Sequence, residues 1–189
     1  MTGEIKVIKF IKVLCATIAC GSLTGTLMAA GNDAATPDEV VLKVRSAAKY
    51  LNAKGPSGFS AFNNTTGPWT WKDSYVFVFD CRKDRMIAHP FRPDLVGRPI
   101  MQIQDNSGKF IFQELCKAGR NPTGGWVEYS WPKLGAGNLS RKLSYSLAAD
   151  ISFTSGIQVG AGIYDDSTTL ADLNKLLERQ FNPAKVPAF

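Results

Sequence analysis

Residues able to do chemistry are few in this chain of 189 residues. It holds one histidine and four cysteines, which leaves little material for a transition-metal site with several ligands or for a histidine-based catalytic centre. The motifs G-x-S-x-G, H-E-x-x-H, Cys-x-x-Cys and the phosphate-binding P-loop are all missing. The sequence therefore predicts a protein that is not an enzyme, and it indicates no cofactor and no metal site.

The cysteines outside the N-terminal segment are Cys81 and Cys116. In an oxidising compartment, two such thiols most simply form one disulfide. This bond would close a loop of about 35 residues and stabilise the fold by about 3–4 kcal/mol. The competing interpretation is a reactive thiol at Cys81 with His89 nearby in sequence, as in a small hydrolase or thiol enzyme. A Cys–His pair without further support is a weak catalytic signal, so we expect the disulfide.

One lysine is a candidate for holding an anion. A ligand pocket needs apolar walls with a few polar groups, and an anionic ligand also needs a cation or several N–H donors. Lys142 stands inside an expected strand, where alternation places it on the opposite face from Leu143 and Tyr145. If that face is concave, the lysine ammonium is a natural partner for a carboxylate. The alternative is that Lys142 points into water.

Aromatic side chains and the single histidine could complete such a pocket. Tyr129 and Trp131 share one face of their expected strand, and Tyr75 offers a hydroxyl on another strand. His89 could hydrogen-bond a ligand, or gain a proton below about pH 6.5. The alternative for all of these residues is a place in the core or, for the histidine, a structural cap. The candidate ligand-binding residues are Tyr75, His89, Tyr129, Trp131, Lys142 and Tyr145.

The first thirty residues have the pattern of a secretory signal peptide. A start with three lysines is followed by residues 13–28, which carry no charge, and then by small residues. We expect residues 1–30 to direct export, with cleavage near residues 29–31, and to leave a periplasmic or secreted protein. The alternative is an uncleaved anchor of residues 5–30 on the outer face of the inner membrane, although its apolar run is short for a span of about 20 residues.

Composition indicates an ordinary globular protein. The chain is 44% hydrophobic and 20% charged, with a formal net charge of +6. No cluster of lysine and arginine is longer than a pair, so nucleic acid is not expected as a partner. We expect a single domain over residues 31–189, with its core within residues 37–166.

Patterns along the exported part predict an α+β fold. Thr36-Pro37-Asp38-Glu39 is a capping box with proline at the first helical position, and it starts a long helix. Strands joined by short turns must be antiparallel. We therefore expect an antiparallel sheet of about five strands, with the long helix packed alongside and a helix at the C-terminus. The strands are expected at 75–79, 85–89, 126–131, 141–148 and 157–164, and a short helix at 109–118.

Several sequence blocks, taken in order, suggest a family. They are YVFVFD at 75–80, HP at 89–90, LVG at 95–97, GWVEYSWP at 125–132, KLSY at 142–145 and VGAGIY at 159–164. Together with the long helix they resemble the type-2 single Cache domain over about residues 37–166. The resemblance implies a PAS-like antiparallel sheet and an extracytoplasmic pocket for small ligands, often organic acids. In that family the domain usually belongs to chemoreceptors or histidine kinases.

The resulting functional hypothesis is a sensor that binds without catalysis. We expect the chain to bind a small organic acid or similar metabolite outside the cytoplasm. No signalling domain follows residue 166 in the sequence, so output is expected to need a partner such as a membrane receptor or histidine kinase. The alternative hypothesis is a structural or interaction module whose degenerate pocket is filled by its own aromatic side chains.

Overall fold

The computed structural model describes residues 34–135, 138–152 and 154–181. The expected signal peptide of residues 1–30 lies outside the described residues. These described residues form one compact unit, and every helix and strand below belongs to it. In the described part of the chain, no helix is long and apolar enough to cross a membrane.

The long helix α1 (Pro37–Lys54) begins at the expected capping box. The Thr36 hydroxyl accepts the Glu39 backbone N–H at 3.3 Å, and the Glu39 carboxylate accepts the Thr36 N–H at 2.9 Å. These two bonds satisfy backbone donors that a helix leaves unpaired at its start. A 3-10 helix, η1 (Gly55–Asn63), follows directly. The apolar face of α1 is buried and consists of Val40, Val41, Val44, Ala47, Ala48 and Leu51.

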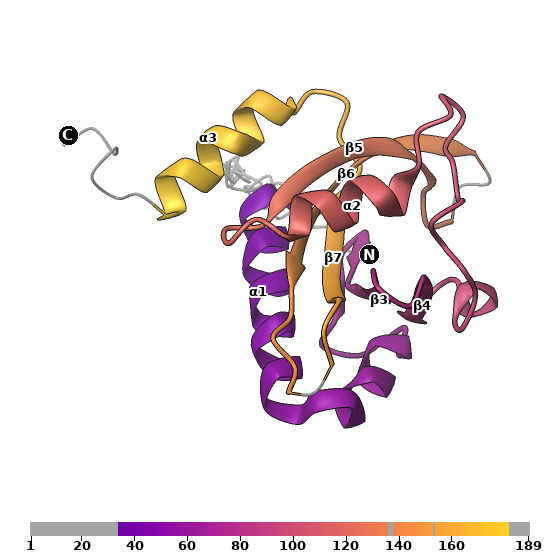
Figure 1. The fold of residues 1–189 in the computed structure, drawn as a ribbon. Coiled ribbons are helices and arrows are strands. Elements are labelled where there is room, and N and C mark those ends of the chain that lie inside the picture. The colour runs from indigo at the N-terminus through magenta and orange to yellow at the C-terminus, as the bar shows by residue number, and fades with distance from the viewer. Residues whose placement is uncertain (1–33, 136–137, 153, 182–189) are drawn as a thin grey trace, which may run out of the picture. The chain divides into compact units, whose positions relative to one another are not determined.

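A five-stranded antiparallel sheet forms the centre of the unit (Figure 1). Its spatial order is β4-β3-β7-β6-β5, so the last strand in sequence lies in the middle of the sheet. A small hairpin of β1 (Thr70–Trp71) and β2 (Ser74–Tyr75) precedes it. The five strands are β3 (Phe77–Asp80), β4 (Arg85–Ala88), β5 (Gly125–Pro132), β6 (Leu139–Ala148) and β7 (Ile157–Ile163). The predicted α+β class with an antiparallel sheet is confirmed.

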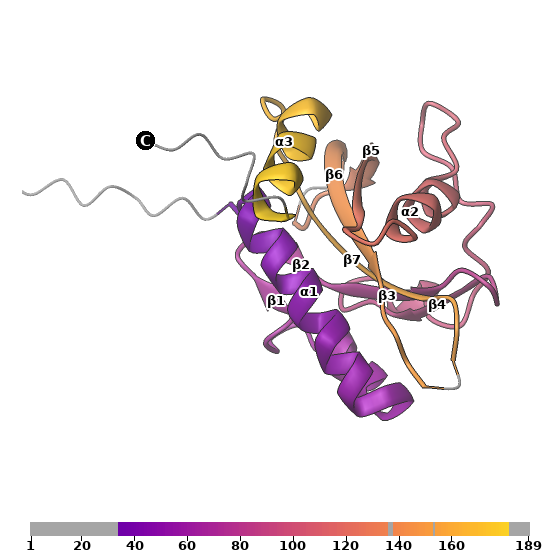
Figure 2. The same cartoon turned by 60° about the vertical axis from the view of Figure 1, so that its left-hand side comes forward.

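Helices cover both faces of this sheet, and β3, β7 and the middle of β6 are buried on both sides. α1 packs on one face, over β6 and β7, and α2 (Ile111–Gly119) packs on the other, over β5 and β6. Figure 2 shows the two helices on opposite sides of the strands. Each face has its own cluster of buried side chains. Between β4 and α2 the chain is irregular apart from the 3-10 turn η2 (Pro93–Leu95).

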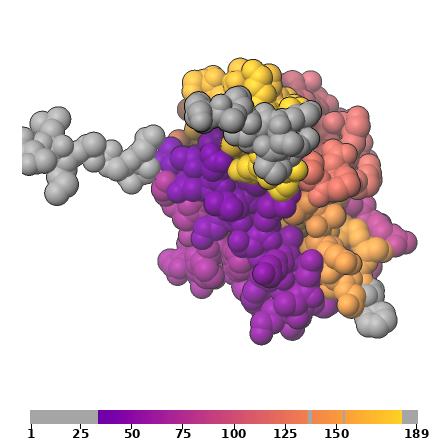
Figure 3. Space-filling view, turned by 90° about the vertical axis from the view of Figure 1, so that its left-hand side faces the viewer, coloured from indigo at the N-terminus to yellow at the C-terminus, as the bar shows by residue number. Residues whose placement is uncertain are grey.

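The closing helix α3 (Leu170–Phe181) lies beside α1, as Figure 3 shows. The Gln180 side-chain amide donates to the Asp38 carboxylate at 2.8 Å. The guanidinium carbon of Arg45 is 3.7 Å from the centre of the Phe181 ring. Two leucines of α3, Leu173 and Leu177, join the buried cluster on the α1 face. The expected amphipathic helix at the C-terminal end of the sheet is therefore present.

A disulfide joins Cys81, directly after β3, to Cys116 in α2. The two residues are 35 positions apart, and their Cα atoms are 5.9 Å apart. The predicted pairing is confirmed, and the competing thiol–histidine site loses its nucleophile. The bond fixes α2 to the same strand that carries Phe77 and Phe79 beneath it.

Candidate functional site

A small hollow lies on the α2 face of the sheet. It brings together five of the six residues that the sequence predicts as ligand-binding: Tyr75, His89, Tyr129, Trp131 and Lys142. They come from β2, from the end of β4, from β5 and from β6, which are far apart in sequence. Phe77 and Phe112 complete the lining. In the described part of the chain, Lys142 is the one charged side chain among these seven.

Lys142 does not point into water. The residue is 1% exposed, and its ammonium donates to the Tyr75 hydroxyl at 3.0 Å. The ammonium also lies 4.1 Å from the centre of the Tyr75 ring and 4.8 Å from that of Tyr164, an arrangement that attracts a cation to the ring faces. No ion pair of the described residues includes Lys142. Burying a charge without a counter-charge costs free energy, and the Lys142 ammonium is such a charge.

Two glycines of β7 make room for the floor of the hollow. A Cβ atom on Gly160 would come within 2.6 Å of the Phe77 ring, and one on Gly162 within 2.9 Å of Lys142 Cε. Real Cβ atoms essentially never make contacts this short. The Phe77 ring and the Lys142 side chain can therefore lie this close to β7 only where that strand has glycine. A Cβ atom on Gly162 would also collide with Ser144 Oγ and the Leu143 carbonyl, so the glycines of β7 allow side chains and backbone of its neighbouring strands to pack closely beneath the hollow.

His89 is held as a neutral ring. Its Nδ1 accepts the backbone N–H of Phe91 at 3.2 Å and of Arg92 at 3.0 Å. Burial, together with the positive charges of Lys142 and Arg92, lowers the pKa of His89 to about 3. Because Nδ1 accepts, the proton of the neutral ring belongs on Nε2, which is thereby a donor. The expected protonation below about pH 6.5 is wrong, and the structural capping role is present.

The remaining predicted aromatic residues form one wall. The Tyr129 hydroxyl shares a 2.9 Å hydrogen bond with the Ser144 hydroxyl, and burial raises the pKa of Tyr129. The Trp131 ring stands edge-on to Tyr129, with ring centres 6.1 Å apart. The guanidinium carbon of Arg92 lies over the Trp131 ring, 5.7 Å from its centre, and that guanidinium is paired with Asp94. These rings supply an apolar wall with hydroxyl and N–H groups at its edge.

Tyr145 does not belong to the hollow. Its ring lies in the cluster on the α1 face, 5.6 Å from the Trp126 ring, and its hydroxyl donates to the Thr123 carbonyl oxygen at 2.5 Å. The physical reason is strand alternation, since Lys142 and Tyr145 are three residues apart on β6 and so face opposite sides. We therefore correct the candidate set by removing Tyr145.

Three residues at the site were missed from the sequence. Phe77 follows Tyr75 by two positions, so alternation along the chain could have found it. Tyr164 lies against Lys142, and its hydroxyl donates to the Pro132 carbonyl at 2.9 Å. Phe112 could not have been found, because no local pattern says which face of the sheet α2 covers.

The hollow is nearly full. Its free volume is about 10 Å³, which is room for about one water molecule. A two-carbon acid is larger than that, so binding one requires a side chain or a helix to move. The arrangement can position an anion by hydrogen bonds and charge, and it offers no nucleophile or general base for a reaction.

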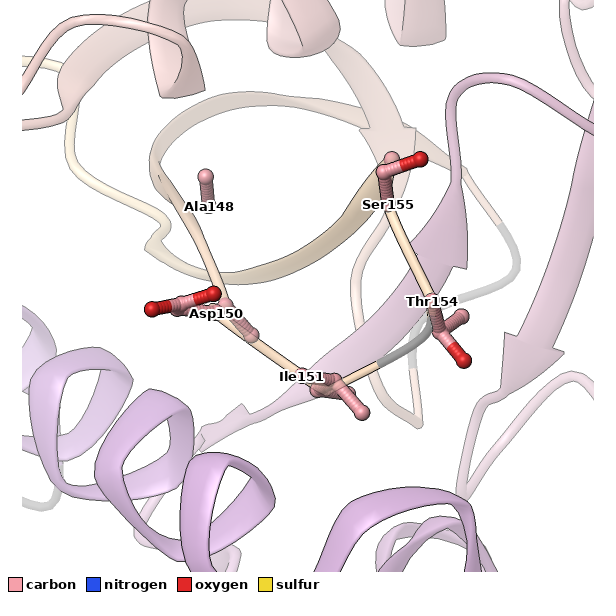
Figure 4. A pocket seen from close by; sticks show the side chains of 7 residues that line it. Ala148, Asp150, Ile151, Thr154 and Ser155 are labelled. Carbon is pink, nitrogen blue, oxygen red and sulfur yellow. The ribbon is translucent and has the colours of Figure 1, made fainter.

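A larger recess lies elsewhere, in the loop between β6 and β7, with a volume of about 590 Å³. Figure 4 shows Asp150 and Ser155 on opposite arms of this loop. None of the six predicted residues lines it, and its described lining contains no cation. It is therefore a poor candidate for an anion site.

Comparison with known proteins places the fold in a family. The sequence profile of the family described as Single Cache domain 2 matches residues 35–170. The methyl-accepting chemotaxis protein McpP of Pseudomonas putida is 33% identical over 94 residues, which make up 50% of this chain and 16% of that protein. The chain therefore spans about a sixth of the length of this curated relative.

Solved structures agree with the profile. One, on the structural basis for carboxylic acid recognition by a Cache chemosensory domain, is 26% identical with a TM-score of 0.55, over 68% of this chain and 92% of that one. A periplasmic sensor domain of a chemotaxis protein is 26% identical with a TM-score of 0.52, over 67% and 90%.

A methyl-accepting chemotaxis protein from Vibrio parahaemolyticus is 18% identical, with a TM-score of 0.55 over 68% of this chain and 88% of that one, and shows the fold alone. The family profile, by contrast, covers more than two thirds of the chain. The sheet, its two covering helices and the non-catalytic hollow all fit that match. The chain belongs to the single Cache domain 2 family of non-catalytic sensor domains.

Proposed function

We propose that this chain binds a small carboxylate at Lys142 and leaves it chemically unchanged. The observation that carries the proposal is the buried ammonium of Lys142, which is 1% exposed and has no ion-pair partner among the described residues. An anion that enters the hollow supplies the missing counter-charge, and the free energy of that pairing is large where water is excluded.

The lining favours a short acid with a single negative charge. A carboxylate oxygen would accept from Lys142 Nζ and from His89 Nε2, while the rings of Phe77 and Trp131 would cover the hydrocarbon part. No described lining residue is acidic, so the ammonium of an amino acid would have no partner. Arg92, a cation beside the Trp131 ring, already pairs with Asp94, so a second carboxylate would find no unpaired partner in it.

The proposed setting is a sensor outside the cytoplasm. A Cache chemosensory domain that recognises carboxylic acids and a periplasmic sensor domain of a chemotaxis protein share this fold. Residues 1–30 are then an export signal, or residues 5–30 an anchor on the outer face of the inner membrane. Residues 31–189 form the sensing domain, whose binding state is passed on by a membrane receptor or histidine kinase.

Calorimetric titration of the purified protein with acetate, propionate, succinate and alanine tests the proposal. Short monocarboxylates should bind, and Lys142→Met should weaken them at least about tenfold, since a charged hydrogen-bonded pair is worth more than 1.4 kcal/mol. Lys133→Met, which removes a half-exposed lysine of the same sheet region, is the matched control and should bind as the parent does. Equal affinity in Lys142→Met, or no binding at millimolar acid, would overturn the proposal.

One observation favours the second candidate, a structural or interaction module with a self-filled pocket. The free space of about 10 Å³ shows that the side chains alone nearly fill the hollow. If that candidate is right, no acid in the titration binds, and Lys142→Met changes only the stability of the protein. The same experiment therefore separates the two.

A further inference from the structure

The walls of the hollow differ in how they are held. Six of the described lining residues are on strands or directly beside them, and Phe77 and Lys142 lie on strands that are paired on both sides. Phe112 is the one that a helix contributes. Because the free space admits about one water, an acid can enter only if a wall moves, and α2 is a wall that strand pairing does not hold.

The ring of Phe112 lines the hollow and contacts Phe77, which in turn contacts Tyr75. It stands edge-on to Phe77 and to Trp131, with ring centres 6.3 Å apart in both pairs and planes at 86°. Phe77 also contacts the Lys142 ammonium, 5.8 Å from its ring centre. A molecule whose carboxylate meets Lys142 therefore extends along Phe77 toward Phe112.

The second half of α2 is fixed to the sheet. Cys116, one turn after Phe112, carries the disulfide to Cys81, and its carbonyl accepts the buried side-chain amide of Gln158 at 2.9 Å. Gly119 lies so close to the sheet that an added Cβ would be 2.7 Å from Ser146 Oγ.

The first half of α2 has no cross-link and is held to the preceding loop by hydrogen bonds. Its N-cap residue, Phe110, makes no side-chain capping bond, while the Ile111 backbone N–H donates to the Ile103 carbonyl at 3.1 Å and the Gln113 amide donates to the Met101 carbonyl at 2.8 Å. Room for a ligand must therefore come from the Phe112 end of the helix, with the disulfide end as the fixed point.

We propose that Phe112 sets the maximum length of the bound acid, and that the Cys81–Cys116 disulfide keeps it in that position. The inference rests on the proposed carboxylate site. Truncating a buried phenyl ring leaves a cavity where it stood, and each further methylene that fits into apolar space strengthens binding by about 0.8 kcal/mol. Acids with two or three extra carbons should then gain affinity relative to acetate.

The test is the ranking of acetate, propionate, butyrate and pentanoate by calorimetry in the parent and in Phe112→Ala. The pentanoate-to-acetate affinity ratio should rise at least about tenfold in the variant. Phe79→Ala is the matched control, because Phe79 is fully buried and contacts both Phe77 and Phe112 but does not line the hollow. It should lose stability as Phe112→Ala does and keep the parental ranking.

Further variants keep the test decisive. If Phe112→Ala does not fold, Phe112→Leu should shift the ratio in the same direction by a smaller factor. Serine at both Cys81 and Cys116 should also raise the ratio, because the fixed point is lost. A parent that binds short acids while Phe112→Ala and Phe112→Leu keep its ranking overturns the inference and leaves the proposed function standing. A parent that binds no acid overturns both.

Discussion

At the scale of single residues, Lys142 lowers the stability of the ligand-free protein and provides a binding site for an anion. A cation taken out of water without a counter-charge costs free energy, and here one tyrosine hydroxyl and aromatic ring faces offset only part of that cost. Functional sites often keep such locally unfavourable groups. The buried lysine is therefore better explained by a ligand than by the fold.

The free-energy cost of burying the Lys142 charge leads to a prediction about stability. Lys142→Met keeps the length of the side chain and removes the charge, so the ligand-free protein should become more stable, by roughly 1–3 kcal/mol. Urea unfolding of parent and variant without added acid measures this directly. A variant that is instead less stable by that amount would mean that the ammonium is already well paired in the free protein.

His89 should make stability depend on pH. Its folded pKa of about 3 lies below the ordinary 6.5, so the unfolded chain binds a proton that the folded chain refuses, and stability falls as pH drops below 6.5. From pH 7 to pH 5 the loss should be about 2 kcal/mol.

The source of that loss can be assigned. His89 is the only histidine of the sequence, and carboxyl groups stay largely ionised in both states over this range. His89→Asn keeps an acceptor for the two backbone N–H groups and cannot titrate, so its unfolding free energy should stay nearly constant between pH 7 and 5. An unchanged slope in the variant would place the proton uptake elsewhere.

Strand alternation accounts for both the success and the failure of residue prediction. Alternation places Lys142 on one face of β6 and Tyr145 on the other. The same rule therefore excludes Tyr145, although it was among the predicted ligand-binding residues. The role of His89 depends on the loop after β4 folding back so that two of its N–H groups meet Nδ1. No spacing of residues in the sequence predicts that this loop folds back.

At the scale of elements, the disulfide is the strongest single constraint on α2. It ties the helix that carries Phe112 to the strand that carries Phe77 and Phe79. Replacing both cysteines by serine should lower the free energy of unfolding by about 3–4 kcal/mol, because the unfolded chain regains the entropy of the open loop.

Urea unfolding of the double variant, with the reduced parent protein as a control, measures this loss. The reduced parent should behave like the variant. A change below about 1 kcal/mol in both would show that packing alone holds α2, and would weaken the role given to the disulfide as its fixed point.

Element boundaries were predictable where local chemistry sets them. The capping box fixed the start of α1, and α2 (Ile111–Gly119) differs from the expected 109–118 by two residues at its start and one at its end. The expected strand 75–79 is interrupted at Val76, because Tyr75 pairs with Thr70 in a hairpin while Phe77 pairs with Gly160. Pairing partners decide such breaks, and they are not local.

At the scale of the whole molecule, the fold class followed from the sequence but the strand order did not. Short turns imply antiparallel neighbours such as β6 and β7, yet β7 also pairs with β3, across a long stretch of chain. The family resemblance implied a PAS-like antiparallel sheet, but the strand order was not predicted. The fullness of the hollow also lies beyond sequence reasoning, because it depends on rings from several elements meeting at one point.

A crystal structure of the protein grown with propionate would show whether the acid binds at Lys142. We expect the carboxylate within about 3 Å of Lys142 Nζ, with the hydrocarbon end beside Phe112 and the first turn of α2 displaced outward. Propionate bound elsewhere, such as at the recess of the β6–β7 loop, or a hollow still closed by its own rings at saturating acid, would contradict the account.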